Sequence, residues 1–353
     1  MNLYINAIGS VSPQKTFDNE VFLQEIIQHD LNKLPAYEPE YKTLINPRRL
    51  RRMSRVIRMG MYAAKVCLGE SSVAMPDAIL VGTGLGCLED TEKFLDAIYE
   101  SEEGILSPTQ FIQSTHNTVS SAIALMLKCY NYNYTYVHRG FSFESAVLDA
   151  RMTMEENGGG NILVGGIDEL TETYLYVTNK MRMWNFDGSP DDDFIKYSQQ
   201  GNLPGEGAAF FMLGSEQDER SYAKITDIQT HYKLAANAVE STIGSFLSSN
   251  ALTVADIDVV CLGLNGNSKK DSIYHDLQEG IFKDSSITYF KHLCGESKTA
   301  TSFGLWMNAQ MLHKQVIPRA IQYKPFTKDG IRRVLMYNNY SNINHSLYLL
   351  EVV

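Results

Sequence analysis

The stretch NYTYVHRGFSFESAVLDA, from Asn133 to Ala150, decides how this chain folds. Tyr134 to Val137 is rich in aromatic and β-branched residues and predicts a short β-strand. Arg139-Gly140 predicts a tight turn, and the alanines and valine that follow predict a helix. A sharp strand-to-helix turn exposes the helix N-terminus, where free N–H groups and the helix dipole activate a thiol and stabilise an oxyanion. Gly140 has no side chain, so this turn presents no nucleophile.

The composition is that of an ordinary globular protein. The 353 residues are enough for one large domain or two smaller ones, and 44% of them are hydrophobic and 20% charged. No apolar run is long enough to span a membrane, and the first residues lack the pattern of a secretory signal. We therefore expect a cytoplasmic protein without a membrane partner. The net charge of −10 argues against a nucleic-acid partner.

Neither a metal nor a cofactor is expected. The five cysteines are scattered and form no CxxC pair, so they indicate neither a disulfide framework nor a zinc site. GTGLG at residues 82–86 lacks the spacing of a dinucleotide-binding loop. Three consecutive aspartates, Asp191 to Asp193, point in different directions and predict a solvated loop instead of a metal site.

One segment is strongly basic: NPRRLRRMSRVIRMG, Asn46 to Gly60. Pro47 suits the first turn of a helix, and Met53, Val56 and Ile57 would form its apolar face. The arginines indicate either a docking site for an acidic or phosphorylated partner, or a solvated helix face whose arginines pair with nearby carboxylates. The second interpretation is the more usual for a charged helix.

Strand and helix patterns alternate along the chain. The predicted strands are Ala78–Gly82, Asn161–Gly165, Asp258–Gly263, Ile331–Tyr337 and His345–Val353. The predicted helices are Gln113–Cys129, Glu144–Glu156 and Ser302–His313. The alternation predicts an α/β fold. A change of composition near residues 214–220 separates two halves with the same kinds of element, which suggests a pseudo-duplicated architecture.

A series of motifs resembles the β-ketoacyl synthases of the thiolase fold in order and spacing. The motifs are VGTGLGCLED, SPTQFIQSTHNTVSSAIA, TYVHRGFSFESA, NILVGGIDELTE, LPGEGAAFFML, LGLNGNSKKD, FKHLCGESKTATSFGLW and NNYSNINHSLYLLE. The most specific is PGEGAAFFML, Pro204 to Leu213, which is similar to the family's GEGAA segment. The resemblance implies a thiolase-like fold with layers in the order αβαβα. Its two halves would be residues 1–215, the ketosynthase N-terminal-like half, and residues 216–353.

The same resemblance implies that the catalytic residues are gone. In the family a cysteine takes the acyl chain from an acyl carrier protein, and two histidines promote decarboxylation and stabilise the enolate. Here Gly140 stands at the cysteine position, Asn265 at the first histidine and Glu296 at the second, after a retained Lys291. The terminal glycine-rich loop is replaced by residues 339–344. Asparagine does not titrate, and an ionised glutamate would oppose an enolate.

Ketosynthase-like chains without a nucleophile resemble the chain-length factors of type II polyketide systems. The resemblance implies a non-catalytic subunit that pairs with an active ketosynthase, or with a second copy of itself, and meets an acyl carrier protein in polyketide or fatty-acid-like synthesis. The chain is also similar to partner subunits of aryl-polyene and flexirubin-type pigment assembly. The pocket and interface positions implied by the resemblance are Phe111, His116, Tyr134, Tyr136 and Phe141.

Two other functions stay open. The chain could be an active condensing or acyl-transfer enzyme in which Cys294, Cys87 or Cys261 serves as a relocated nucleophile; acylation of one of them would favour this. It could also be a homodimeric scaffold that binds an acyl carrier protein without any ketosynthase, which a stable homodimer that ignores ketosynthases would favour.

Overall fold

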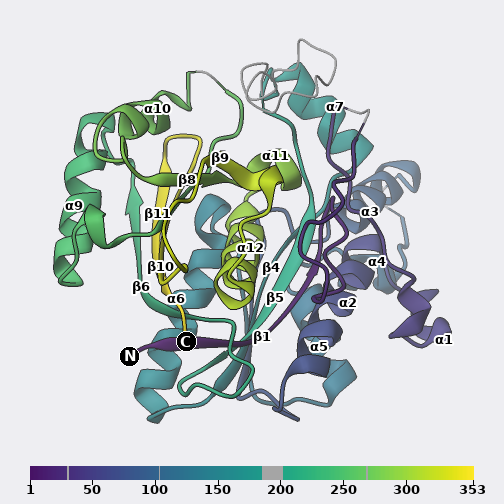
Figure 1. Cartoon of the computed structure of the whole chain (residues 1–353). Helices are drawn as coiled ribbons and strands as arrows, with labels where there is room; N and C mark the ends of the chain where they lie inside the picture. Colours follow the sequence, from purple (N-terminus) through teal and green to yellow (C-terminus); the bar gives the residue numbers. More distant parts are fainter. Residues whose placement is uncertain (30–31, 103, 185–201, 268) are drawn as a thin grey trace.

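A computed structural model describes residues 1–29, 32–102, 104–184, 202–267 and 269–353 (Figure 1). The strands are β1 (Leu3–Val11), β2 (Ala78–Gly82), β3 (Tyr132–Tyr136), β4 (Asn161–Asp168), β5 (Gly207–Gly214), β6 (Ala223–Tyr232), β7 (Val259–Leu262), β8 (Ser286–Tyr289), β9 (Gln322–Lys324), β10 (Arg333–Tyr340) and β11 (Asn344–Glu351). The helices are α1 (Pro47–Leu50), α2 (Arg55–Glu70), α3 (Leu88–Glu100), α4 (Pro108–Gln113), α5 (Thr118–Leu127), α6 (Ser142–Asn157), α7 (Glu172–Lys180), α9 (Val239–Ser249), α10 (Ser272–Glu279), α11 (Lys291–Cys294) and α12 (Ala300–Lys314). The predicted α/β alternation is confirmed. Asp191 to Asp193 lie outside the described residues.

One strand order occurs twice in the sheet, which runs β3-β2-β4-β5-β1-β6-β11-β10-β7-β8-β9. β1 is antiparallel to β5 and β5 to β4, whereas β4, β2 and β3 are parallel neighbours. β6, β11, β10, β7 and β8 repeat this arrangement, and β9 is added at the far edge. The two parts join where β1 pairs with β6. The expected division after residue 215 falls in the connection between β5 and β6 and stays a prediction.

Helices cover the sheet in alternating layers, because each face of each half is apolar. The central apolar cluster contains Phe143 and Val147 of α6 together with Trp306 of α12, and inward-facing residues of both halves of the sheet, such as Phe211 and Met336. A second cluster packs α2 and α5 on the outer face of the N-terminal half, and a third packs α9 and α10 on the outer face of the C-terminal half. Figure 1 shows α12 in the middle, with α9 and α10 on one side and α2 and α5 on the other. The order αβαβα is therefore confirmed.

Two predicted helices are each divided. The expected helix from Gln113 to Cys129 is interrupted at residues 114–117, where Thr118 Oγ1 donates to the carbonyls of Ile112 and Thr115 and so competes with helical hydrogen bonds. The arginine segment is likewise not one helix but α1 and α2, with residues 51–54 between them. None of the described helices has the length and apolarity needed to cross a bilayer.

Candidate functional site

The strand-to-helix turn forms as the sequence predicts. β3 leads into a single 3-10 turn, Arg139–Phe141, and then directly into α6. Arg139 has a φ of 49°, which reverses the chain at the point where the helix begins. Ser142 Oγ accepts a hydrogen bond from the His138 N–H (2.8 Å) and donates to the Arg139 carbonyl (2.8 Å), so the turn is closed by its own residues. Gly140 is buried at the start of α6.

The space beside Gly140 is filled by Tyr340. A Cβ atom at position 140 would lie 2.6 Å from Tyr340 Cβ and 2.9 Å from its Cγ, closer than real Cβ contacts allow. Tyr340 ends β10 and belongs to the segment 339–344, which is expected in place of the family's glycine-rich loop. Burial and the nearby charge of Glu296 raise the pKa of the phenol, so it stays protonated. Position 140 therefore has neither a reactive side chain nor room for one, and its correspondence to the family's nucleophile remains a prediction.

Asn265, Glu296 and Lys291 come together in one buried cluster. Glu296 Oε2 accepts hydrogen bonds from Asn265 Nδ2 (2.6 Å) and from Lys291 Nζ (3.0 Å). Lys291 Nζ also donates to the Asn339 carbonyl (3.1 Å). Only 2% of Lys291 and 5% of Glu296 is exposed. The carboxylate that stands where the second histidine is expected thus neutralises the buried lysine, and that these are the former catalytic positions remains a prediction.

The loop that carries Asn265 is fixed by Asp271. The carboxylate of Asp271 accepts hydrogen bonds from the backbone N–H groups of Asn265 and Gly266. Burial raises the pKa of Asp271 to about 6, although these hydrogen bonds and the charge of Lys291 favour its ionised form. The cluster is a set of charges and dipoles held by the fold, without an imidazole among the residues named here.

Glu144 is a buried acid whose importance the sequence reasoning missed. It lies one turn after Gly140 on α6 and is fully buried, and neither carboxylate oxygen makes a well-aligned hydrogen bond to the described residues. Burial raises its pKa to about 7, and the nearby hydroxyls of Thr301 and Ser346 and the charge of Lys291 oppose this only in part. The sequence feature that could have revealed Glu144 is an acidic residue at a core-facing position of the predicted helix.

Glu206 of the GEGAA-like segment has a structural role. Its carboxylate binds both terminal nitrogens of Arg55 (2.5 Å each) and accepts from the N–H groups of Ala36 and Leu170 (2.8 Å each). Because these residues come from α2, the N-terminal loop and the segment after β4, one buried side chain ties three parts of the chain to β5. The sequence identified the motif but not this function of its glutamate.

Two of the expected interface residues, Tyr134 and Tyr136, lie on the edge strand β3, whereas Phe111 lies on α4 and His116 between α4 and α5. β3 is the edge strand, and among the described strands only β2 pairs with it. Tyr134 is 50% exposed and Phe111 58% exposed, His116 is exposed and Tyr136 is half-buried. Phe141 is buried and contacts the ring of His138. Tyr134, Phe111 and His116 are therefore accessible at the surface and Phe141 is not, and the roles of all five residues remain a prediction.

The five cysteines are free and buried. Burial raises the pKa of Cys261 to about 11 and raises the pKa values of Cys87 and Cys294 as well, so these thiols are protonated at neutral pH. For Cys294, Lys291 opposes the effect of burial and Glu296 adds to it. This environment does not favour a relocated nucleophile. Among the described residues no group of three or more His, Cys, Asp or Glu side chains is arranged to hold a metal ion.

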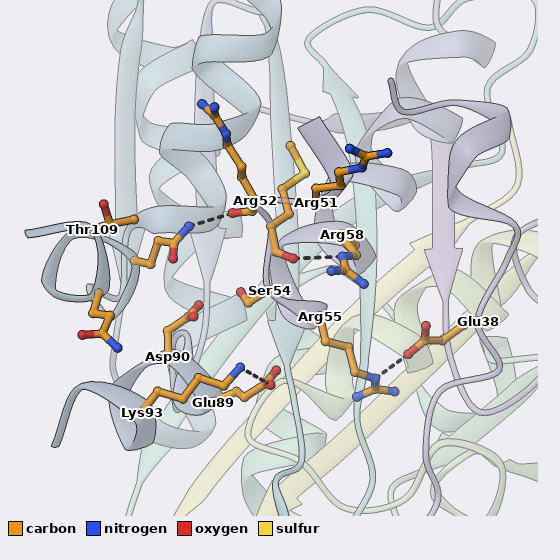
Figure 2. A pocket seen from close by; sticks show the side chains of 13 residues that line it. Glu38, Arg51, Arg52, Ser54, Arg55, Arg58, Glu89, Asp90, Lys93 and Thr109 are labelled. Carbon is orange, nitrogen blue, oxygen red and sulfur yellow. Dashed lines mark hydrogen bonds and ion pairs between the residues drawn. The ribbon is translucent and has the colours of Figure 1, made fainter. Parts of the chain in front are cut away.

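The arginine segment lines an open pocket of about 800 Å³ between α2, α3 and α4 (Figure 2). Arg55 pairs with the exposed Glu38 and the buried Glu206, and Lys93 pairs with Glu89, so one arginine of the segment does pair with nearby carboxylates. Arg51 and Arg52 are exposed and make no ion pair with the described residues. The segment thus combines structural ion pairs with free cationic side chains.

Comparison with known proteins agrees with this geometry. Residues 29–184 match the sequence model of the β-ketoacyl synthase N-terminal domain. The ishigamide ketosynthase/chain length factor is similar over 100% of this chain and 99% of its own, with 15% identity and a TM-score of 0.79. A β-ketoacyl synthase from Burkholderia phymatum is similar over the same shares, with 14% identity and a TM-score of 0.77. A type II PKS acyl-carrier protein in complex with its ketosynthase bound to the hexaketide gives 13% identity and a TM-score of 0.73, again over 100% and 99%. No curated protein sequence matches the chain.

Proposed function

Because the chain is β-ketoacyl synthase-like in sequence over residues 29–184 and has the thiolase-like fold of the ketosynthases throughout, we propose that it is a non-catalytic ketosynthase-like subunit. Its partner would be an active ketosynthase of a type II polyketide or fatty-acid-like system, of which aryl-polyene and flexirubin-type assembly are the narrower candidates. The observation that carries the proposal is the packing of Tyr340 against Gly140, the position that the sequence resemblance assigns to the nucleophile.

The chemistry of the remaining site supports this proposal. Condensation needs a covalent acyl carrier and a group that stabilises an enolate oxygen. Gly140 has no side chain that could hold the acyl group, and the carboxylate of Glu296 is neutralised by Lys291. Asn265 does offer hydrogen-bond donors, but its Nδ2 is committed to Glu296. An amide that is already bound in this way gives little assistance to a developing negative charge.

The edge of the sheet supports pairing with another subunit. An exposed edge strand without charged residues or proline is an association site unless something covers it. β3, YNYTY, has neither, and Tyr130, Tyr132, Tyr134 and Val137 expose large apolar surface around it. The name of one structural neighbour couples a ketosynthase with a chain length factor, which is the kind of assembly proposed here. Stable interfaces of this type bury roughly 2,000 Å² or more, so the complex should survive purification.

The arginine pocket supports contact with an acidic partner protein, and an acyl carrier protein is the one we propose. Arg51 and Arg52 project from the rim of the pocket in Figure 2, away from Glu89 and Asp90. Cationic side chains without ion pairs lose little on binding carboxylates of a partner, and they accelerate its approach. The name of another structural neighbour shows that a ketosynthase can be bound to its acyl-carrier protein.

The decisive experiment separates catalysis from pairing. The purified chain is incubated with acyl- and malonyl-carrier proteins and weighed intact, and we expect no acyl adduct on any cysteine. It is then coexpressed with a cysteine-bearing ketosynthase of a type II system, chosen from the same genome, and we expect a complex that stays together on size exclusion. A stoichiometric adduct would show an active enzyme, and a homodimer that takes up no ketosynthase would show a scaffold; either result overturns the proposal.

If Phe111 and His116 reach the partner's tunnel, their size sets the product length. We expect Phe111→Ala and His116→Ala to shift the products of the reconstituted pair, read by mass, while the partner's cysteine stays reactive. An unchanged distribution from both variants would remove the length-setting role and leave the pairing proposal intact.

A further inference from the structure

The cluster of Lys291, Glu296 and Asn265 contains the three groups that an amide-forming reaction needs. Lys291 supplies an amine, Asn265 a carboxamide and Glu296 a carboxyl group between them. One oxygen, Glu296 Oε2, accepts from both Lys291 Nζ (3.0 Å) and Asn265 Nδ2 (2.6 Å). The two nitrogens are therefore no farther apart than the sum of these contacts, which places the amine beside the carboxamide.

We propose that Lys291 and Asn265 form an intramolecular isopeptide bond, with Glu296 as the residue that moves the protons. This inference goes beyond the proposed function, because neither pairing nor the loss of condensation requires a cross-link. The reaction is a transamidation within one chain and needs no cofactor.

The atoms balance as follows. Glu296 takes a proton from the Lys291 ammonium, and the lone pair of Nζ attacks Asn265 Cγ to give a tetrahedral adduct. The Cγ–Nδ2 bond then breaks, and Nδ2 leaves as ammonia with a proton supplied through Glu296. Starting from an ammonium and a carboxylate, the products are one secondary amide, one ammonia molecule and a protonated Glu296. Nothing is oxidised or reduced.

The surroundings favour each step. Lys291 and Glu296 are almost completely buried, which keeps water away from the amine and the carboxamide. The side-chain oxygen of Asn265, Oδ1, accepts a hydrogen bond from the Asn267 N–H (3.0 Å). This hydrogen bond would stabilise the negative charge that develops on Oδ1 during the attack. The hydrogen bond from Lys291 Nζ to the Asn339 carbonyl restricts the movement of the amine away from Glu296 and Asn265.

The topology also brings the two residues to the same place. β7 and β8 are parallel and in register, with Leu262 opposite Tyr289. Asn265 follows the end of β7 and Lys291 follows the end of β8, so both lie beyond the carboxyl ends of adjacent strands. A bond between them would clamp these two strands together at that edge.

The test is the intact mass of the purified full-length protein. We expect the main species to be lighter than the sequence by one ammonia molecule, and tandem mass spectrometry to find a branched peptide joining Lys291 to Asn265. A wild-type protein with the full sequence mass overturns the proposal.

A matched control is needed because Asn265 precedes Gly266, and an Asn-Gly pair also loses ammonia when it closes to a succinimide. Lys291→Arg keeps a cation beside Glu296 but removes the attacking amine, and Glu296→Gln keeps the size of the side chain but removes the proton carrier. We expect both variants to have the full sequence mass. Ammonia loss that persists in Lys291→Arg identifies the succinimide and overturns the isopeptide bond.

Discussion

Replacing Glu144 by glutamine measures how strongly the central layer disfavours a negative charge. The Glu144 carboxyl lies between α6, α12 and β11, close to Thr301 and Ser346, and the charge of Lys291 acts on it from α11. The Tyr348 phenol on β11 also faces it, and that phenol has a raised pKa because of burial and the Glu144 charge. The pKa of Glu144 rises from 4.5 to about 7, so the folded protein holds a proton that the unfolded chain has already released.

The sign follows from proton binding. Between the two pKa values the native state binds more protons than the unfolded state, so stability falls as pH rises. The contribution is fully present below pH 4.5 and is lost as the pH passes about 7. At roughly 1.4 kcal/mol for each pKa unit, the wild type should lose about 2–3 kcal/mol from this group between pH 5 and pH 8.

The assay is urea unfolding of both proteins at pH 5 and at pH 8. Other buried acids titrate in this range, notably Asp271 and Glu169, but their effects cancel when Glu144→Gln is compared with the wild type. We expect the variant to gain about 2–3 kcal/mol relative to the wild type on going from pH 5 to pH 8. Glu156→Gln, at an exposed position near the end of the same helix, is the control and should show no such gain. An equal difference at both pH values would refute the reasoning.

Three further predictions address other parts of the molecule. Gly140→Cys should give no condensation with carrier-protein substrates and should lose about 1–3 kcal/mol in urea unfolding, because the new side chain meets Tyr340; turnover or unchanged stability would contradict this. Glu206→Gln should cost about 2–3 kcal/mol by the same measurement because it loses charge-assisted bonds to Arg55, whereas Glu38→Gln at the more exposed partner should cost less than about 1 kcal/mol. Tyr134→Asp should place a charge on the β3 edge and dissociate the complex on size exclusion, and a complex that persists would move the interface elsewhere.

The sequence predicted the parts of the fold that depend on local pattern. The buried strand Ala78–Gly82 was confirmed at its predicted bounds, since a continuous apolar run between polar segments leaves few alternatives. The break between α4 and α5 could not be predicted from the local sequence pattern, because it depends on the competition between the Thr118 hydroxyl and helical hydrogen bonds. The pairing of β1 with β6, which joins the two halves, involves residues far apart in the chain and has no local signal.

The site was predictable as a set of positions but not as a set of contacts. Gly140, Asn265 and Glu296 could each be identified from a motif, yet only the structure shows that Tyr340 occupies the space beside Gly140. Likewise the sequence gives no reason to expect that Asn265 and Lys291 share one oxygen of Glu296. Glu144 was overlooked because a glutamate within a helix is ordinarily assigned to the solvent face.

If Gly140 and Glu296 occupy former catalytic positions, as proposed, each is now fixed by a neighbouring residue. In a chain without the cross-link, Lys291 is a buried ammonium that pairs with Glu296, and the loss of this carboxylate would leave a strongly destabilising unpaired charge. Restoring a histidine in place of Glu296 alone would remove that partner, and restoring a cysteine in place of Gly140 alone would collide with Tyr340. Each reversal is therefore unfavourable unless its neighbour changes as well, so the site is coupled and its substitutions are not additive. In the proposed non-catalytic subunit such a site need not accommodate a reacting substrate, and the surfaces available for a partner are an uncharged strand edge and the free arginines.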